Sequence, residues 1–277
     1  MIRMIMGIGL HIAARRRERM PEHILSLSYG KDSLACLGAI EQLGWPLDRI
    51  VHAEVWATDT IPADLPPMVG FKSKADKVIR ERWGIEVEHV RSKRSYQDIF
   101  YMVCHGEKSR IAGKIYGWPF QRGPWCNSRL KQHILSSVLK GTIQYIGIAA
   151  DEPNRFHVLS EKKRSPLVEA GWTEADCHKW CEVNDLLSPI YATATRGGCW
   201  FCHNQSVGQL RILRKDYPEL WSLMLKWDKD NPVTFKADGH TVHDYDRRFQ
   251  LEDEGLIRPE ERFLWSMLDE ELNYRWF

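Results

Sequence analysis

The sequence has no apolar stretch long enough to cross a membrane. A transmembrane helix needs about 20 consecutive apolar residues, and no run in the 277 residues approaches this length. The basic cluster Arg15–Arg17 follows an apolar opening segment, whereas a secretory signal peptide carries its basic residues first. We therefore expect a cytoplasmic protein with no membrane partner, in which residues 1–19 form a disordered or dispensable extension.

The chain also has little net charge. Its 39 lysines and arginines nearly balance its 37 aspartates and glutamates, which leaves a charge of +2. Such a balance gives no overall nucleic-acid signature, so any nucleic-acid site must be local. The segment between Gly106 and Gly123 is one candidate, and a solvated surface loop is the alternative. Its basic residues are Lys108, Arg110, Lys114 and Arg122.

Phosphate-binding sequences of the Walker type are missing as well, because neither Gly-Lys-Ser nor Gly-Lys-Thr occurs. A different motif, Ser28-Tyr29-Gly30-Lys31-Asp32-Ser33, lies between the apolar segments 24–27 and 34–40. We name it the glycine loop. The pattern predicts a strand, a sharp turn at Gly30 and a helix whose first N–H groups point back at the loop. With two serine hydroxyls and one ammonium, such a loop could hold a triphosphate. An ordinary strand-to-helix turn is the alternative.

Strand-like and helix-like segments alternate along the first half of the chain. Apolar segments at 24–27, 50–56, 85–90 and 143–149 predict strands, and residues 66–83 predict a helix that Gly84 ends. This alternation predicts an α/β fold with a doubly wound, mostly parallel sheet. We expect a nucleotide-binding domain over residues 20–160. A helical, cysteine-containing metal-binding region over residues 161–277 would pack on it.

Three motifs follow one another in a specific order. They are the glycine loop, Cys126-Asn127-Ser128-Arg129-Leu130-Lys131, and Gly147-Ile148-Ala149-Ala150-Asp151-Glu152-Pro153-Asn154-Arg155. From Glu22 to Gln205 the chain resembles the phosphoadenylyl-sulfate (PAPS) reductase-like family of the PP-loop ATP pyrophosphatase (adenine nucleotide alpha hydrolase) superfamily. The resemblance implies a PP-loop that binds an adenine nucleotide and catalyses through Lys31, Asp32 and Ser33. The nucleotide-binding residues that it implies are Ser28, Tyr29, Gly30, Lys31, Asp32, Ser33, Asp59, Asp151, Glu152 and Arg155.

Seven cysteines without a secretory signal indicate a reducing compartment, in which thiols bind metals or react. Cys199 and Cys202 form a Cys-x-x-Cys pair that can supply two ligands to one metal. Cys126 lies in the motif shared with the family, and Cys181 lies on a predicted helix just before the segment that returns the chain to the Cys-x-x-Cys pair. Together they would complete a four-thiolate site, for which the resemblance favours a [4Fe–4S] cluster, with Zn²⁺ as the alternative. Buried small hydrophobes or a redox pair would explain the Cys-x-x-Cys pair without a metal. Substitutes for the fourth ligand are Cys104, Cys177 and His203.

The expected activity is that of an ATP pyrophosphatase. ATP with Mg²⁺ would adenylate an acceptor for sulfur transfer to nucleic acid or to a small molecule. The expected partners are thus an adenine nucleotide and a nucleic acid or sulfur donor. The alternative enzyme is a PAPS or adenylyl-sulfate reductase that releases sulfite, although no cysteine follows Cys202 in this sequence to act as its catalytic thiol. A non-catalytic nucleotide-binding module is the third interpretation, and the oligomeric state stays open.

Overall fold

The computed structural model describes residues 20–120, 122–192, 197–229, 231–260 and 263–266, so the expected extension over 1–19 lies outside the described residues. The described residues form a five-stranded sheet in which all neighbouring strands are parallel. The strands are β1 (His23–Ser26), β2 (Arg49–Glu54), β3 (Val87–Arg91), β4 (Ile143–Tyr145) and β5 (Lys163–Arg164), in the order β3-β2-β1-β4-β5. The predicted α/β fold with a parallel sheet is confirmed.

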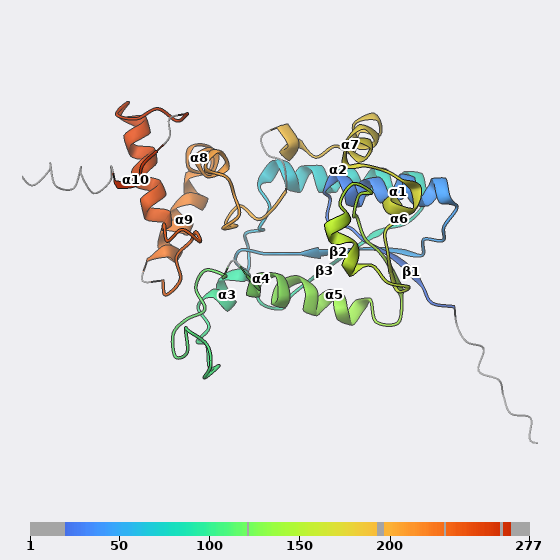
Figure 1. Ribbon diagram of the computed structural model, residues 1–277, viewed down its shortest axis with the longest axis horizontal. Coiled ribbons are helices and arrows are strands. Elements are labelled where there is room, and N and C mark those ends of the chain that lie inside the picture. The colour runs from blue at the N-terminus through green and yellow to red at the C-terminus, as the bar shows by residue number, and fades with distance from the viewer. Residues whose placement is uncertain (1–19, 121, 193–196, 230, 261–262, 267–277) are drawn as a thin grey trace, which may run out of the picture.

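Helices connect these strands and continue beyond the last one. In chain order they are α1 (Lys31–Leu43), α2 (Pro66–Trp83), α3 (Tyr96–Phe100), α4 (Trp125–Asn127), the π-helical turn η1 (Ser128–Gln132), α5 (His133–Val138), the 3₁₀ turn η2 (Pro153–Val158), α6 (Pro166–Ala170), α7 (Glu174–Val183), the 3₁₀ turn η3 (Pro189–Ala192), α8 (Val207–Asp216), α9 (Pro218–Asp228) and α10 (Val242–Asp253). In Figure 1, α1, α2 and α7 lie above the sheet and α5 lies below it. Both faces of the sheet are therefore covered, as in a doubly wound fold. Within the described ranges, no helix combines the length and the apolar character needed to traverse a bilayer.

Local sequence signals set the ends of the two long helices. Helix α1 buries its apolar segment 34–40 and ends at Gly44, whose φ is 63°. Helix α2 begins with Pro66 in its first turn and ends at Gly84, whose φ is 69°. Proline suits a first turn because its N–H would have no intrahelical partner, and glycine adopts positive φ without a steric penalty. The predicted helix 66–83 and its end at Gly84 are confirmed.

The strand order reverses between β1 and β4. From β1 the chain proceeds to β2 and β3 on one side, and then returns to β4 and β5 on the other side. Open parallel sheets bind ligands beyond the carboxyl ends of their strands at such a reversal. The topology therefore brings the residues that follow β1 close to those that follow β4.

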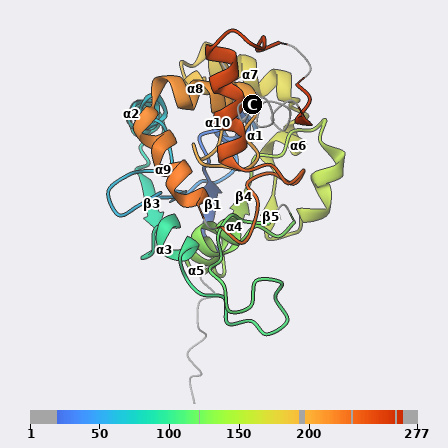
Figure 2. The same ribbon diagram turned by 90° about the vertical axis from the view of Figure 1, so that its left-hand side faces the viewer.

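The C-terminal helices lie beyond one end of the sheet, and Figure 2 shows α9 and α10 in front of the strands. Trp200 joins this region to the segment after β2, because its indole N–H donates to the carbonyl of Pro62 at 2.9 Å. Trp227 of α9 donates in the same way to Gln97 of α3 at 3.0 Å. Both tryptophan side chains are buried in one aromatic core. The helical region thus packs on segments that follow β2 and β3.

The sheet layer continues past residue 160, where the nucleotide-binding domain was expected to end. β5 pairs with β4, and both α6 and α7 contact α1. Leu167 of α6 and two cysteines of α7 belong to the same buried cluster as the apolar face of α1. These elements therefore pack with the sheet, and helices α8, α9 and α10 follow the segment that carries the Cys-x-x-Cys pair.

Candidate functional site

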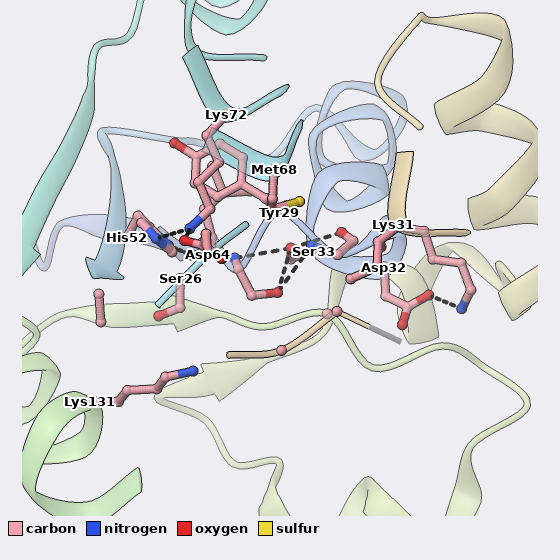
Figure 3. A pocket seen from close by; sticks show the side chains of 18 of the residues that line it. Ser26, Tyr29, Lys31, Asp32, Ser33, His52, Asp64, Met68, Lys72 and Lys131 are labelled. Atoms are coloured by element: carbon pink, nitrogen blue, oxygen red, sulfur yellow. Dashed lines mark hydrogen bonds and ion pairs between the residues drawn. The ribbon is translucent and has the colours of Figure 1, made fainter. Parts of the chain in front are cut away.

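A cavity of about 670 Å³ opens where the strand order reverses, and all residues of the glycine loop line it. Its other walls come from α2, from the segment after β4 and from the segment that precedes Cys199 (Figure 3). Pockets that hold nucleotides and other small ligands commonly enclose about 300–1,000 Å³. The cavity is therefore large enough for a ligand in contact with the glycine loop.

Hydroxyl groups stabilise the shape of the glycine loop. The Ser33 hydroxyl donates to the carbonyl of Gly30 at 3.0 Å and accepts from the Ser28 amide at 3.1 Å. The hydroxyl oxygens of Ser28 and Ser33 lie 2.9 Å apart. The amide of Lys31 donates to the Tyr191 hydroxyl of η3 at 2.9 Å. These bonds leave the serine hydroxyls and the first turn of α1 at the cavity wall.

The expected sharp turn at Gly30 is wrong. Gly30 has a φ of −76°, which any residue can adopt, whereas Tyr29 has a φ of 58° in the left-handed region. A Cβ atom at position 30 would lie 3.4 Å from the Tyr191 hydroxyl, which is an ordinary contact. The turn is made by the tyrosine because its buried side chain compensates for the unfavourable backbone conformation.

The close packing around the glycine loop requires a glycine at position 147, which lies outside the loop. At Gly147, after β4, a Cβ atom would lie 2.6 Å from the amide nitrogen of Ser33. No side chain fits at that distance, so only glycine lets the segment after β4 approach the first turn of α1 this closely. Position 147 lies within the third sequence motif, although the motif by itself did not reveal this contact.

Charged groups of both signs surround the first turn of α1. The Lys31 ammonium lies 2.8 Å from Asp32 and 3.4 Å from Glu174 of α7. Burial lowers the pKa of Lys31, but the hydrogen bond to Asp32 and the nearby carboxylates outweigh burial and raise it overall. Carboxylate oxygens of Asp32, Glu152 and Glu174 lie within 4.8 Å of one another. The cavity therefore has a cationic and an anionic group side by side at the glycine loop.

The four other predicted nucleotide-binding residues divide into two pairs. Glu152 and Arg155 line the cavity and form an ion pair at 2.8 Å. Asp59 and Asp151 are not among the lining residues, and both are exposed. Asp151 instead accepts the amide of Glu174 at 3.0 Å and so stabilises the start of α7.

Several polar lining residues were not predicted. They are His52, Asp64, Lys72, Lys131, Glu174 and Tyr191. Lys131 is the last residue of the second motif, so the resemblance contained a signal for it. Tyr191 has no such signal, because it lies 160 residues after Lys31 in the sequence.

Three of the four predicted metal ligands, Cys126, Cys199 and Cys202, come from neighbouring segments, because Cys126 and Cys199 pack against the same core and Cys202 lies one turn after Cys199. Their three sulfur atoms do not all lie within 4.8 Å of one another. Burial raises the pKa of Cys126 to about 11 and that of Cys199 to about 12. The Cys202 amide donates to the Cys199 carbonyl at 3.0 Å, which forms the turn of the Cys-x-x-Cys pair. Cys199 also lines the cavity, as does Lys131, whose ammonium points into it in Figure 3. The cysteine cluster, defined here as Cys126, Cys199 and Cys202, therefore borders the candidate nucleotide site.

Cys181 does not belong to this cluster. Its thiol donates to the carbonyl of Lys31 at 3.3 Å, behind the glycine loop. Cys36 and Cys177 lie in the same buried hydrophobic cluster as Cys181. The physical reason is the packing of α7 on α1, which turns both cysteines of α7 into the core. The structure therefore does not assemble the expected four-thiolate set.

A buried tyrosine hydroxyl lies near the cysteine cluster. Tyr96 is 1% exposed, and its hydroxyl has no hydrogen-bond partner among the described residues. Burial raises the pKa of Tyr96, and the charges of the three cluster cysteines raise it further. A buried donor without an acceptor costs free energy, and a thiolate sulfur would supply an acceptor. The Tyr96 hydroxyl would thus gain an acceptor if a metal–thiolate group were held there, although the three sulfur atoms do not all lie within 4.8 Å of one another.

Comparison with models of known protein families gave no match, and comparison with curated proteins gave none either. Evidence about function therefore comes from the residues of the cavity and of the cysteine cluster.

Proposed function

We propose that this chain is a PP-loop ATP pyrophosphatase, which binds ATP in the cavity and adenylates an acceptor for sulfur transfer to nucleic acid or a small molecule. The observation that supports the proposal most directly is the glycine loop at the cavity wall. There, two linked serine hydroxyls and the first turn of α1 lie side by side, and Lys31, whose ammonium pairs with Asp32, lines the same cavity. Helix N-termini and hydroxyl donors bind phosphate oxygens well, and a lysine adds a mobile positive charge. Three types of donor around one cavity suit a polyphosphate better than a single carboxylate.

Lys31 is the residue that would offset charge on the departing pyrophosphate. Its ammonium pairs with the carboxylates of Asp32 and Glu174. These two carboxylates and that of Glu152 form an oxygen-only set of the kind that Mg²⁺ prefers, so a bound Mg²⁺ would compete with Lys31 for them. When bound there, Mg²⁺ would neutralise phosphate charge. Lys31 is then free to turn from the carboxylates to the phosphates.

The reaction that fits this arrangement is an in-line displacement. An acceptor oxygen attacks the α-phosphorus of ATP, the bond between that phosphorus and the bridging oxygen breaks, and pyrophosphate leaves. A sulfur nucleophile then displaces the adenylated oxygen, and AMP leaves. Ser28 and Ser33 would orient the phosphates for the first step, and Lys31 would stabilise the leaving group.

The cysteine cluster would hold the [4Fe–4S] group, or Zn²⁺ as the alternative, next to the nucleotide. A [4Fe–4S] group supplies electron-transfer chemistry when bound. The support comes from Cys199, which belongs both to the cluster and to the cavity wall. A donor set of three thiols also leaves room for a fourth ligand.

A sulfonucleotide reductase is the second candidate, and the position of Cys199 favours it. A reductase needs a thiolate that attacks the sulfate sulfur of the nucleotide, and among the described cysteines Cys199 alone lines the cavity. Burial raises the pKa of this thiol to about 12, which disfavours the thiolate at neutral pH. We therefore place the pyrophosphatase first.

Nucleotide titration of matched variants tests the proposal. Ser33→Ala removes a hydroxyl that links the loop, and we expect about tenfold weaker MgATP binding. Lys31→Ala removes the ammonium, and we expect a loss between about 10-fold and 100-fold because the bond is charge-assisted. Ser137→Ala is the control, since that hydroxyl only donates to the carbonyl of Ile134 on exposed α5. Isothermal titration calorimetry would measure the affinities, and wild-type affinity in both loop variants would contradict the proposal.

A further inference from the structure

Tyr29, in the middle of the glycine loop, has an unfavourable backbone conformation. Its φ of 58° lies in the left-handed region, which Asp185 alone shares among the described non-glycine residues. A bulky residue in this region costs free energy and persists only when surrounding contacts hold it there. The contacts of the Tyr29 side chain therefore decide the shape of the loop.

The Tyr29 side chain is fully buried and ends on a carboxylate of α2. Its hydroxyl donates to one oxygen of Asp76. The same hydroxyl lies 3.2 Å from Nε2 of His89 on β3, and that nitrogen lies 2.9 Å from the other oxygen of Asp76. Asp76 thus receives a hydrogen bond from the loop on one oxygen and one from the sheet on the other.

His89 is itself held from both sides. Its Nδ1 lies 2.7 Å from Glu54 at the end of β2, so each ring nitrogen faces a carboxylate. Glu54 accepts in turn from the indole N–H of Trp56 at 3.1 Å. The hydrogen bonds to Asp76 and Glu54 raise the pKa of His89 against the effect of burial. A protonated ring donates to both carboxylates and holds them in place.

A second set of contacts connects the Tyr29 ring to the cavity wall. The Lys72 ammonium lies 5.2 Å from the ring centroid, and the His52 ring contacts the Tyr29 ring edge-on at 4.8 Å. Lys72 also donates to Nε2 of His52 at 2.9 Å and to Asp64 at 2.5 Å (Figure 3). Burial and Lys72 lower the pKa of His52 to about 3, so this ring is neutral and can accept that bond. Lys72 and His52 therefore hold the ring of Tyr29, while Asp76 and His89 hold its hydroxyl.

We propose that Asp76 and His89 are positioning residues of the glycine loop, which act through the Tyr29 hydroxyl to keep the loop in its phosphate-binding shape. The inference rests on the proposed binding of ATP at this loop. Rotation of Tyr29 to a negative φ would turn the peptide groups on either side of it. The Ser28 hydroxyl and the Gly30 amide, now 3.4 Å apart, would then separate. A loop held in its binding shape before the ligand arrives binds more tightly, because less ordering is needed on binding.

A double-mutant cycle on MgATP affinity tests this role. Tyr29→Phe removes only the hydroxyl, and Asp76→Asn removes the charge of its acceptor. We expect each single variant to bind MgATP about tenfold more weakly in calorimetric titration. The double variant should bind no more weakly than the weaker single variant, because both changes break the same contact.

A matched carboxylate-to-amide variant separates positioning from stability. Asp228 is buried, accepts from the Trp118 indole at 2.7 Å and from the Val242 amide at 2.8 Å, and does not line the cavity. Asp228→Asn should lower the melting temperature and leave MgATP affinity unchanged at a temperature where every variant is folded. If Asp76→Asn does not fold, Tyr29→Phe carries the test, since it changes a single oxygen atom.

The pH dependence of affinity provides a readout that a purely structural role would not affect. The titratable and charged groups around His89 are Glu54 and His52 on β2, Asp64 before α2, Asp76, Lys72, Lys77 and Arg80 on α2, Glu86 before β3, and Tyr29 in the loop. Because the folded pKa of His89 is raised, the contribution of its protonated form to the network is fully present at low pH and is lost as pH rises through that raised pKa. Above about pH 7, where phosphates are already ionised, we expect wild-type affinity to fall. In His89→Gln it should be weaker and independent of pH.

The outcomes distinguish this inference from the proposed function. Weak binding by Ser33→Ala together with wild-type affinity in Tyr29→Phe and Asp76→Asn would overturn the positioning role and leave the nucleotide site standing. Absence of MgATP binding by the wild-type protein would overturn both. Additive losses in the double variant would show that Asp76 does not act through Tyr29.

Discussion

One methyl group at Gly147 tests how closely the segment after β4 approaches the glycine loop. A Cβ atom there would lie 2.6 Å from the Ser33 nitrogen, 2.8 Å from the Asp32 carbonyl carbon and 2.9 Å from the Ser33 Cα. Carbon atoms in favourable contact are separated by about 3.5–4.0 Å. All three neighbours are backbone atoms of the first turn of α1, so they cannot rotate aside as a side chain would. Gly147→Ala must therefore displace either α1 or the end of β4.

The size of the effect follows from this rigidity. Overpacking a well-packed site costs about 1–3 kcal/mol, and we expect the upper end of that range for a clash with backbone. For a domain of this size, about 3 kcal/mol corresponds to a fall in melting temperature of roughly 6–12 °C. MgATP affinity should fall as well, because the displaced turn carries the Ser33 amide and hydroxyl to which we assign phosphate binding. Urea denaturation and calorimetric titration would measure the two effects.

A second glycine supplies the control. Gly70 lies within α2, and a Cβ atom there would meet no atom within 4 Å. Gly70→Ala should therefore raise stability by about 0.5–1 kcal/mol, because alanine is the better helix residue. If Gly147→Ala were as stable as the wild type and bound MgATP as tightly, the close approach of the segment after β4 to the glycine loop would be refuted.

The remaining predictions concern the cysteines. Cys199→Ser should lose bound iron or zinc, whereas Cys181→Ser should keep it, because only Cys199 lies in the cysteine cluster. Elemental analysis and visible absorption after anaerobic purification would measure this, and equal metal loss in both variants would contradict the grouping. Tyr96→Phe should keep the fold and weaken metal affinity by about 10-fold to 100-fold, as loss of a hydrogen bond to a metal ligand commonly does. A chelator competition assay would test that effect, and unchanged affinity would mean that the Tyr96 hydroxyl does not donate to the metal–thiolate group.

Much of the fold could be predicted because the signals lie within a few residues of one another. The helix over 66–83 has a proline in its first turn and Gly84 at its end, and both are read directly from the sequence. The parallel sheet follows from the alternation of apolar strand segments with helices. The lengths of the strands were less predictable: β4 ends at Tyr145 although the apolar segment continues to 149. Strand ends depend on the partner strand, here the short β5, which pairs at two positions.

The candidate site was predictable only where its residues are neighbours in the chain. The glycine loop was expected at a ligand site from its own composition, and it lines the cavity. Cys126 was grouped with the Cys-x-x-Cys pair by resemblance, and Cys126 and Cys199 pack against the same core. Cys181 shares the residue type but lies elsewhere, because the helix that carries it packs on α1. Spacing in the sequence does not tell which face of a helix turns to which neighbour.

The sequence by itself determined the glycine loop, the helix ends and the parallel α/β class, because these depend on local backbone preferences and hydrophobic periodicity. Only the tertiary structure decided that Tyr29 rather than Gly30 makes the turn, since the compensating contacts come from Asp76 and His89 on other elements. It also decided that Gly147 must remain glycine and that Cys181 packs behind the glycine loop, away from the other predicted metal ligands. Each of these depends on how elements distant in the sequence pack against one another, and packing is a property of the whole chain.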